Sequence, residues 1–254
     1  MKEPNKLTTQ KYWETYYSKN HANKKHIVNV CSYYDPFWDQ LISQNSKGKS
    51  IIEIGGFPGR YLAYLSSKFG LVPTCLDFNS DESQIKNSFE IMEVDRFNIL
   101  QEDFTKYQPK QQYDYVISNG FIEHFDDFNT ILDLHTQYLK PGGSMLVMIP
   151  NKRYLRKIYG YLCDYNNLKA HNLKSMKLSV FKKYAKRNDL KIKTHQYYGG
   201  FPFSVHQKQN AFQKVISKTT RLVFKKINPY LMKNPSKYLS ASIIAIFEKP
   251  INVE

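Results

Sequence analysis

The residues of this sequence that are best suited to hold a ligand surround a glycine-rich turn. Gly55, Gly56 and Gly59 follow the apolar run 51–54, and an apolar periodicity resumes at Tyr61. This pattern predicts a buried strand, a tight turn and a helix. Glycine lets the backbone approach a ligand closely, and a helix N-terminus points free N–H groups at it. The stretch therefore predicts a site for a nucleotide-like ligand.

The spacing of the glycines disfavours two common nucleotide sites. A dinucleotide fingerprint, G-x-G-x-x-G, that began at Gly55 would need glycine at two positions where this chain has Phe57 and Arg60. A Walker phosphate loop would need Gly-Lys-Ser/Thr after Gly59, and the chain does not have it there. We therefore expect a ligand without a pyrophosphate.

Two segments resemble motifs of one enzyme family. The run 53–59, Glu-Ile-Gly-Gly-Phe-Pro-Gly, resembles the first motif of class I S-adenosylmethionine-dependent methyltransferases, E/D-x-G-x-G-x-G, with Phe57 in place of the middle glycine. The run 113–125, which contains Glu123-His124, resembles the "fDvV…EH" segment of methyltransferases that act on small molecules, quinones, lipids and sugars. The resemblance covers about residues 50–149 and extends more loosely over the whole chain.

The resemblance implies S-adenosylmethionine as the cofactor and S-adenosylhomocysteine as its product. This ligand needs an acceptor for its ammonium group, an acidic group for its ribose diol and an apolar slot for adenine. The implied binding residues follow the first four strands: Glu53, Gly55, Gly56, Gly59, Asp77, Phe78, Asp103, Phe104, Ser118, Asn119 and Gly120. Asp77 is implied at the ribose hydroxyls, and Asp103 or its neighbour Glu102 near the adenine amino group.

The acidic residues also have structural alternatives. Asp77 would otherwise cap the helix over 80–90, and Asp103 would likewise serve as a helix cap. Asp126 and Asp127 precede a predicted helix, so we interpret them as its caps rather than as metal ligands. We expect no metal.

Methyl transfer is an in-line displacement, so the protein mainly positions the reactants and supplies a base when the acceptor is a hydroxyl. His124 is the histidine nearest the expected reaction centre, and an unperturbed pKa near ~6.5 suits a catalytic base. Its structural alternative is a hydrogen-bonded anchor at the strand–helix junction, a role we also expect for Glu123. His171, His195 and His206 belong to the second half, and the sequence does not decide which of them approach the site.

The fourth strand disfavours two acceptor classes. A methyltransferase acting on nucleobase or glutamine nitrogen would show Asn-Pro-Pro-Tyr/Phe where this chain has Asn119-Gly120-Phe121. A cytosine C5 enzyme would carry a nucleophilic cysteine in this region, and the chain has none there.

The elements that must position these residues alternate along the chain. Strands are predicted over 51–54, 73–78, 97–101, 112–118 and 144–149. Helices are predicted between them over 60–69, 81–90 and 126–139, the last stopped by Pro141-Gly142-Gly143. The alternation predicts a parallel sheet with helices on both faces. The resemblance implies a Rossmann-like α/β fold of seven, mostly parallel strands with an antiparallel last strand.

Beyond residue 150 the pattern predicts fewer elements. We expect helix 178–187, strand 190–198, helix 208–227, a connection bounded by Pro229 and Pro235, and strand 239–247. In helix 208–227 the apolar residues Phe212, Val215, Ile216, Leu222, Val223 and Ile227 are expected on one side. The basic residues on the other side are Lys214, Lys218, Arg221 and Lys225. Such a helix lies at a membrane interface or covers the sheet.

The N-terminal segment predicts two helices. Residues 7–20 form an amphipathic helix with Tyr12, Trp13, Tyr16 and Tyr17 at helical spacing. These aromatic side chains either pack on the core or cover the ligand as a lid. A loop is expected at 21–25, and a second helix over 29–43, broken or started near Pro36.

Charge divides the 254 residues into two parts. Residues 1–150 hold 15 Lys/Arg and 18 Asp/Glu, a net charge of −3, whereas residues 151–254 hold 22 and 4, a net charge of +18. This asymmetry indicates an anionic partner for the second part, or else a solvated basic surface. Apolar runs are far shorter than the ~20 residues of a spanning helix, and no signal peptide is expected. Three scattered cysteines favour a cytoplasmic protein, and the basic second half leaves a peripheral position at a membrane open.

The sequence thus predicts a single methyltransferase domain, 1–254. Its parts are an N-terminal helical lid (1–49), a cofactor-binding half (50–150) and a basic acceptor-side half (151–254) with a helical insertion at about 205–237. The predicted reaction is S-adenosylmethionine-dependent methyl transfer, directed to oxygen, on a small-molecule, glycan or lipid-linked acceptor. The basic half would contact an anionic part of that acceptor or a membrane surface.

Two alternatives stay open. An RNA acceptor would suit the +18 half, whose basic residues are interleaved with Tyr and Phe. A non-catalytic binding protein with the same fold is the other, and Phe57 is its only hint. The acceptor, the methylated atom and the oligomeric state do not follow from the sequence.

Overall fold

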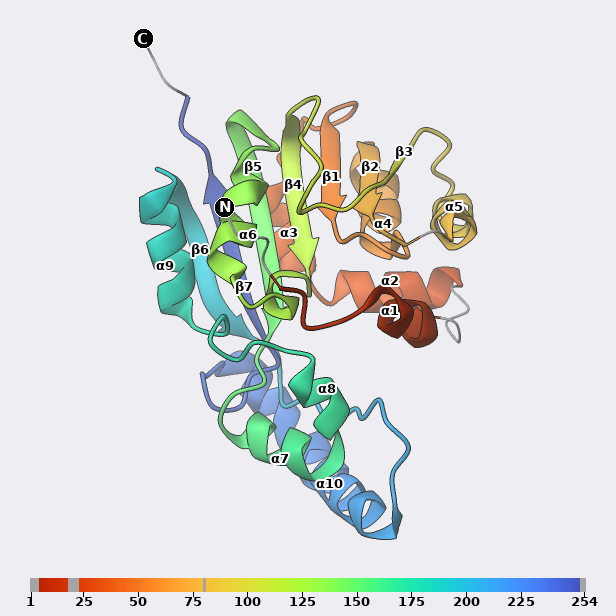
Figure 1. The fold of residues 1–254 in the computed structure, drawn as a ribbon, viewed down its shortest axis with the longest axis vertical. Helices are drawn as coiled ribbons and strands as arrows, with labels where there is room; N and C mark the ends of the chain where they lie inside the picture. The colour runs from red at the N-terminus through yellow and green to blue at the C-terminus, as the bar shows by residue number, and fades with distance from the viewer. Residues whose placement is uncertain (1–4, 18–22, 80, 252–254) are drawn as a thin grey trace.

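The computed structural model describes residues 5–17, 23–79 and 81–251, and its centre is a seven-stranded sheet (Figure 1). The strands are β1 (Ser50–Ile54), β2 (Val72–Asp77), β3 (Asn98–Gln101), β4 (Tyr113–Asn119), β5 (Leu139–Pro150), β6 (Lys191–Tyr198) and β7 (Ser242–Glu248). Their order is β3-β2-β1-β4-β5-β7-β6. β1 to β5 run parallel, and β7 pairs antiparallel with both β5 and β6. The predicted fold is confirmed.

The first half alternates strands and helices as predicted. α4 (Arg60–Phe69) follows β1, and α5 (Glu82–Ile91) follows β2. Gly70 ends α4 with φ +67°, and its N–H donates to the Ser66 carbonyl at 2.8 Å. Glycine adopts this left-handed conformation without a steric penalty, which is why the helix ends there. Asp81 caps α5 by accepting from the backbone N–H of Ser83.

The segment between β4 and β5 differs from the prediction. α6 (Phe128–Thr136) stands where a helix over 126–139 was expected, and a short 3-10 helix that was not predicted, η1 (Ile122–His124), precedes it. Asp127 caps α6, as predicted. Leu139 already belongs to β5, paired with Tyr113 of β4, and residues 141–143 lie within that strand. Sheet pairing outweighs the helix-stopping tendency of these residues, which is a local signal.

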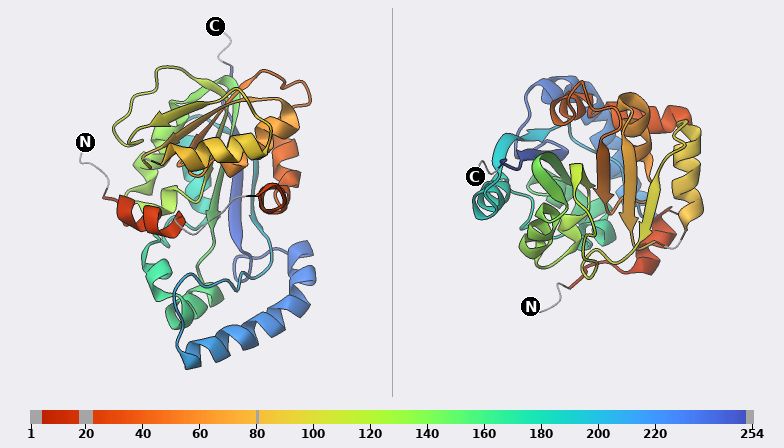
Figure 2. Two further views of the ribbon diagram at one scale, coloured as in Figure 1. Left: turned by 90° about the vertical axis from the view of Figure 1, so that its right-hand side faces the viewer. Right: turned by 90° about the horizontal axis from the view of Figure 1, so that it is seen from above.

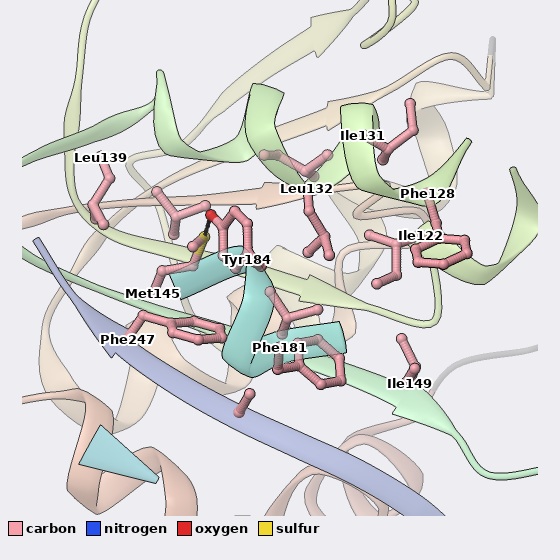
Figure 3. Close-up of a cluster of buried hydrophobic side chains, with 14 of the residues drawn as sticks. Ile122, Phe128, Ile131, Leu132, Leu139, Met145, Ile149, Phe181, Tyr184 and Phe247 are labelled. Carbon is pink, nitrogen blue, oxygen red and sulfur yellow. Dashed lines mark hydrogen bonds between the residues drawn. The ribbon is translucent and has the colours of Figure 1, made fainter. Parts of the chain in front are cut away.

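Apolar side chains cover both faces of the sheet, and Figure 2 shows helices on both sides of it. On one face, α6 and α9 (Leu178–Arg187) bury Leu132 and Phe181 against the strands (Figure 3). Tyr184 of α9 points its hydroxyl at the sulfur of Met145 in β5. On the other face, Trp38 lies in a second cluster formed by α4, α5, α2 (Lys24–Ser32) and α3 (Asp35–Leu41).

The N-terminal helices differ from the prediction in extent. The helix predicted over 29–43 is broken near Pro36, as expected, into α2 and α3, but α2 begins at Lys24, within the predicted loop 21–25. Pro36 lies in the first turn of α3, where its missing N–H costs no helical hydrogen bond. α1 (Gln10–Tyr17) has no buried residue. The remainder of the predicted helix and the start of the following loop, residues 18–22, lie outside the described residues, as do residues 1–4 of the N-terminus.

The chain after β5 forms a lobe that the sequence predicted only in part. We define the basic lobe as residues 151–171 and 201–241. It contains α7 (Leu155–Cys163) and α8 (Tyr165–Lys169), which were not predicted, and α10 (Ala211–Lys233), which continues through Pro229. Asn210 and Gln213 form a capping box at the start of α10. The lobe extends beyond the carboxyl ends of β4 and β5 (Figures 1 and 2).

The face of α10 that packs inward also differs from the prediction. Leu231 is buried with residues of α7, and Phe224 stacks on Phe201 with ring centroids 4.0 Å apart. By contrast, Phe212 is 70% exposed and Leu222 is 60% exposed. The expected apolar side therefore splits between packing and solvent, because only tertiary contacts decide which sector of an amphipathic helix is covered.

Candidate active site

Two adjoining cavities lie at the carboxyl ends of the central strands. The first has a volume of about 450 Å³ and the second about 330 Å³. Five residues line both cavities: Trp13, Tyr17, Asn119, Gly120 and His124. The carboxyl edge of an open α/β sheet is where such folds bind ligands. A molecule in the first cavity would therefore meet a molecule in the second across β4 and η1.

The glycine-rich turn forms one wall of the first cavity. Gly55 has φ +70°, and a Cβ atom there would lie 2.3 Å from Cδ2 of Phe121, so only glycine fits. Gly59 also has a left-handed conformation, φ +85°, immediately before α4. Phe57, which replaces the usual glycine, is buried, and its ring contacts Tyr17 edge-on at 4.9 Å. The departure from the motif thus joins the turn to α1.

Asp77 ends β2 and is fixed by the backbone around it. Its carboxylate accepts from the N–H of Phe57 at 3.1 Å and from the N–H of Asn79 at 2.8 Å. Burial raises the pKa of Asp77, and these hydrogen bonds oppose that rise. The capping alternative for Asp77 is wrong, because Asp81 caps α5. Phe78 is half exposed beside it and lines the same cavity.

Asp103 lies at the far end of the first cavity. Its carboxylate accepts from Lys6 Nζ at 2.6 Å and from the Thr105 N–H at 3.0 Å. Partial burial would raise the pKa of Asp103, but these contacts hold it below its usual value. A turn over 104–106, rather than a helix, follows Asp103, so its helix-capping alternative is wrong. Phe104 and the alternative acid, Glu102, line the cavity too.

Glu53 lies behind the turn as a buried acid. The Asn119 Nδ2 donates to Glu53 Oε1 at 2.7 Å, whereas Oε2 has no hydrogen-bond partner among the described residues. Burial raises the pKa of Glu53 to about 8, and the hydrogen bond from Asn119 opposes this. Gly56 is packed so closely that a Cβ would lie 2.9 Å from Cys75 Sγ. These residues shape the wall without lining the cavity.

The walls of the first cavity match the chemistry of S-adenosylmethionine. Asp77 offers a carboxylate, and Phe78, Phe104 and Phe121 offer an apolar slot. Among the described residues, Lys6 is the basic residue that lines this cavity, and its charge is paired with Asp103. Ser118, at the end of β4, is buried and its hydroxyl has no partner among the described atoms. The individual binding roles stay predictions.

His124 stands where the two cavities meet. Its Nδ1 lies 2.7 Å from the carbonyl of Ala170, so Nδ1 carries the hydrogen and Nε2 is free to accept one. Burial lowers the pKa of His124 to about 4, which keeps the ring neutral. Trp13 contacts the ring edge-on at 4.8 Å. The hydrogen bond to Ala170 agrees with the anchoring role that the sequence offered for His124, and its role as a base stays a prediction.

The second cavity holds two buried cations that the sequence did not single out. Lys152 follows β5 directly, and Arg156 lies in the first turn of α7; they are 8% and 7% exposed. None of the ion pairs among the described residues includes either side chain. Burial, and then the charge of Arg156, lowers the pKa of Lys152 to about 7. Arg156 Nη1 has no hydrogen-bond partner there.

The structure separates the three histidines of the second half. His171 and His206 line the second cavity, and His195 lies on β6 and lines neither cavity. Nδ1 of His206 lies 3.1 Å from Oδ2 of Asp164, within hydrogen-bond distance. The sequence signal for Lys152 was its place right after a long apolar strand, at the edge where the other site residues lie. Arg156 and His171 had no such signal, because helices α7 and α8 were not predicted.

Three residues at the junction offer atoms that a metal ion could use. One atom each from Glu123, His124 and His171 lies within 4.8 Å of the others. Zinc–ligand bonds of about 2.1 Å keep two ligands of one ion within ~4.2 Å, so this group would have to contract to bind zinc. Both carboxylate oxygens of Glu123 lack hydrogen-bond partners among the described residues, and burial raises the pKa of Glu123 to about 8.

Solved structures with this fold include several methyltransferases. A methyltransferase from Geobacter sulfurreducens in complex with S-adenosyl-L-homocysteine is 14% identical, with a TM-score of 0.56 over 95% of this chain and 98% of that chain. A putative sarcosine dimethylglycine methyltransferase from Galdieria sulphuraria is 15% identical, with a TM-score of 0.59 over 95% and 98%. These likenesses establish the shared fold of the class.

Curated relatives match a part of the chain. A malonyl-[acyl-carrier protein] O-methyltransferase of Ilyobacter polytropus is 31% identical over 108 residues, 42% of this chain and 41% of that protein. Its counterpart from Priestia megaterium is 29% identical over 136 residues, 48% and 49% respectively. The chain therefore matches these relatives over less than half of their length.

The family follows from a match that covers most of the chain. Residues 29–195 match the family described as methyltransferase domain. The chain belongs to this family of class I S-adenosylmethionine-dependent methyltransferases. The predicted family, enzyme class and cofactor are confirmed.

Among the helices of the described residues, none combines the length and the apolar character that a membrane span requires.

Proposed function

We propose that this chain transfers a methyl group from S-adenosylmethionine to an oxygen atom of a small anionic acceptor, free or carried on a lipid, a glycan or an acyl carrier. The observation that carries this proposal is the pair of buried cations, Lys152 and Arg156, in the second cavity. Arg156 donates to the Ser204 carbonyl and lies over the rings of Tyr159 and Phe201, but no carboxylate of the described residues pairs with either cation. A buried charge without a counter-ion is costly, and an anionic ligand would remove that cost. The cavity meets the predicted cofactor site at Asn119, Gly120 and His124.

The proposed reaction needs little beyond alignment. S-adenosylmethionine supplies a methyl group on a positively charged sulfur. An acceptor oxygen forms a bond to the methyl carbon while the carbon–sulfur bond breaks, and that electron pair stays on sulfur. Lys152 and Arg156 would hold the acceptor anion, and the walls shared by the two cavities would set the line of attack.

The protonation state of His124 limits the class of acceptor that can react. With its pKa lowered to about 4, the neutral ring is a weak base, although Nε2 is free to accept a proton. A carboxylate acceptor is already ionised and needs no base, so we propose a carboxylate as the methylated group. The names of the curated relatives, which describe O-methylation of malonyl-[acyl-carrier protein], support this class of acceptor.

Of the predicted lid, residues 1–49, α1 is proposed to cover the site, whereas α2 and α3 pack in the second core cluster. α1 buries none of its residues in the core, but Trp13 and Tyr17 line both cavities. Tyr17 packs partly against the second core cluster, but no residue of α1 is fully buried, and a helix with so small a share in the core is suited to open and close over ligands.

A methyl-transfer assay with matched acceptors tests the proposal. S-adenosylhomocysteine formation would be measured with a malonyl thioester, with the corresponding neutral methyl ester, and with total RNA. We expect turnover with the free acid alone and a product that releases methanol when it is hydrolysed by base. Turnover with RNA alone, or equal turnover with the acid and the neutral ester, would contradict the proposal.

Arg156→Met tests the anion site within the same assay. We expect the KM for the acid to rise by roughly 30- to 100-fold, because an interaction with a buried charged group is worth about 2–3 kcal/mol. Affinity for S-adenosylmethionine, measured by calorimetry, should stay within about twofold. Lys157→Met, an exposed neighbour on α7 that lines neither cavity, is the matched control.

A further inference from the structure

The basic lobe carries most of the exposed apolar surface of the chain. It makes up about a quarter of the residues but holds twelve of the seventeen large apolar or aromatic side chains that are exposed in the described chain. The twelve are Leu155, Ile158, Tyr161, Leu162, Tyr165, Phe212, Val215, Leu222, Val223, Ile227, Tyr230 and Tyr238. Such a concentration on one part of a protein indicates an interaction surface.

Both long helices of the lobe contribute to this surface. In α7, Tyr159 and Cys163 face the small core of the lobe, whereas Leu155, Ile158 and Leu162, at helical spacing, face outward. The two helices pack beside each other: Gln213 near the start of α10 donates to the carbonyl of Leu162 at 2.9 Å. The outward apolar residues are therefore not needed to hold α7 and α10 together.

The two flanks of the packed stripe of α10 differ in character, whereas the outermost side of the helix carries Val215 and Leu222 together with Lys226 and Lys233. Taking the buried stripe as the reference, helical spacing places Phe212, Val223 and Tyr230 on one flank. The opposite flank carries Lys214, Lys218, Arg221 and Lys225. A packed stripe, an apolar flank, a basic flank and an outer side with residues of both kinds allow a helix to lie along an anionic bilayer surface while it remains attached to a protein.

The exposed charged side chains of the lobe are all basic. It contains 13 Lys/Arg and a single acidic residue, Asp164, which is buried and bonded to Asn167 and His206. Of the 13 cations, Lys152 and Arg156 belong to the second cavity, and the other 11 are exposed or half-exposed. No acidic side chain of the lobe, all of which is described, lies at its surface.

Three occupants of such a surface can be compared by their chemistry. A second copy of the chain would bring like charge to like charge. A nucleic acid would match the charge but leave the aliphatic side chains, such as Ile158, Val215 and Leu222, in water. A bilayer that contains anionic phospholipid matches both, because basic side chains attract its headgroups and apolar and tyrosine side chains enter the interface.

We propose that the basic lobe docks the protein on a membrane surface that contains anionic phospholipid, with α7 and α10 lying in the interface. Docking does not depend on the proposed reaction. It would nevertheless assist with a lipid-linked acceptor, because Arg156 and His206 of the lobe also line the second cavity. A docked lobe brings that cavity near the headgroups.

Vesicle co-sedimentation of the full chain tests docking. The probes are vesicles of pure phosphatidylcholine and vesicles with about one-third phosphatidylglycerol, at 0.1 M and 0.5 M NaCl. We expect the protein to sediment with the anionic vesicles, at least tenfold more weakly with the neutral ones, and to be released by high salt. Equal binding to both vesicles, or none to the anionic ones, would overturn the proposal.

Two sets of variants locate the contact. Lys214→Glu/Lys218→Glu/Lys225→Glu reverses the basic flank, and Phe212→Ser/Val223→Ser removes apolar contacts; each should weaken vesicle binding by more than tenfold. The matched control is Lys182→Glu/Lys183→Glu/Lys186→Glu on α9, which changes the net charge of the chain equally and should retain most of the binding. Equal loss in both charge sets would point to a non-specific charge effect and refute docking through the lobe.

A measurement on the unaltered protein keeps the test independent of variant folding. Hydrogen exchange with and without anionic vesicles should slow within residues 155–165 and 211–233 and stay unchanged in α9. Protection elsewhere, or protection by RNA without vesicle binding, would refute the assignment of this surface to a bilayer.

Discussion

Burial, rather than residue type, sets the charges in this site. Glu53 and Glu123 have their pKa raised to about 8, His124 has its pKa lowered to about 4, and burial lowers the pKa of Lys152 to about 7. In each case removal from water favours the neutral form. Three of these groups, Glu123, His124 and Lys152, line the second cavity, and such a group of shifted side chains in a cavity indicates a functional site.

The predicted cofactor site can be tested at two positions. Asp77→Ala should weaken S-adenosylmethionine binding by roughly 30- to 100-fold, the value of a hydrogen-bonding carboxylate (about 2–3 kcal/mol). Gly55→Val should abolish binding, because its side chain would meet Phe121 and its φ is +70°. Calorimetry measures both. Asp81→Ala is the control: it should cost about 1 kcal/mol of stability through the lost cap and leave the affinity unchanged.

Acceptor binding should depend on pH through Lys152. In the free protein its pKa is lowered to about 7, so the protonated form that attracts an anion is lost as the pH rises above about 7. We expect the KM for an anionic acceptor to rise by up to about tenfold per pH unit above neutrality. Ionisation of Glu123 near pH 8 acts in the same direction. A flat KM between pH 6 and 8.5 would contradict this assignment.

The same lysine should limit stability. Its folded-state pKa lies below the unfolded value, so burial of its charge opposes folding in full below about pH 7, and the penalty fades as pH rises toward about 10.5. Lys152→Met should therefore raise the free energy of unfolding by on the order of 2–4 kcal/mol at neutral pH, and less at pH 10. Denaturant unfolding measures it. A variant that is more stable but less active would mark Lys152 as a functional residue.

At the level of elements, α1 and α3 carry tryptophans with opposite expected effects. Trp13 lines both cavities from a helix without buried residues, whereas Trp38 is fully buried in a core cluster. Trp13→Ala should raise the Kd for S-adenosylmethionine by roughly tenfold and change stability by less than about 1 kcal/mol. Trp38→Ala should cost about 3–5 kcal/mol of stability.

Thermal unfolding and calorimetry on the two tryptophan variants separate lid from core. If Trp13→Ala destabilised the protein as much as Trp38→Ala and left cofactor affinity unchanged, α1 would be an ordinary packing helix. The sequence left open whether the first helix is a lid or packs on the core, because both roles predict the same four aromatic residues at helical spacing.

Element ends were predictable where a local device sets them. Gly70 ends α4, Asp81 begins α5 and Asp127 begins α6, each through a hydrogen bond within a few residues. Prediction failed where distant partners intervene. Leu139 enters β5 because it pairs with Tyr113, and α10 passes Pro229 because Leu231 packs into the core of the lobe.

Over the whole molecule, the charge asymmetry of the sequence corresponds to two spatially separate parts of the structure. The sheet and its flanking helices carry the predicted cofactor site, and the basic lobe projects beyond the carboxyl ends of the strands (Figure 1). The second cavity lies between them, lined by β5, η1 and lobe residues such as Arg156 and His206. An anionic acceptor and an anionic surface would approach the protein from the same side.

The sequence by itself determined the family, the α/β fold and the predicted cofactor residues. Motifs such as 53–59 and 113–125 are contiguous, and parallel strands bring their carboxyl ends to one edge regardless of detail. Only the tertiary structure decided which cations are buried, which histidines enter the second cavity and which flank of α10 remains exposed. Lys152, Arg156 and His171 are brought together by helices that the pattern did not predict. Their burial, which shifts their pKa, is caused by segments distant in the sequence, and a local pattern holds no information about those segments.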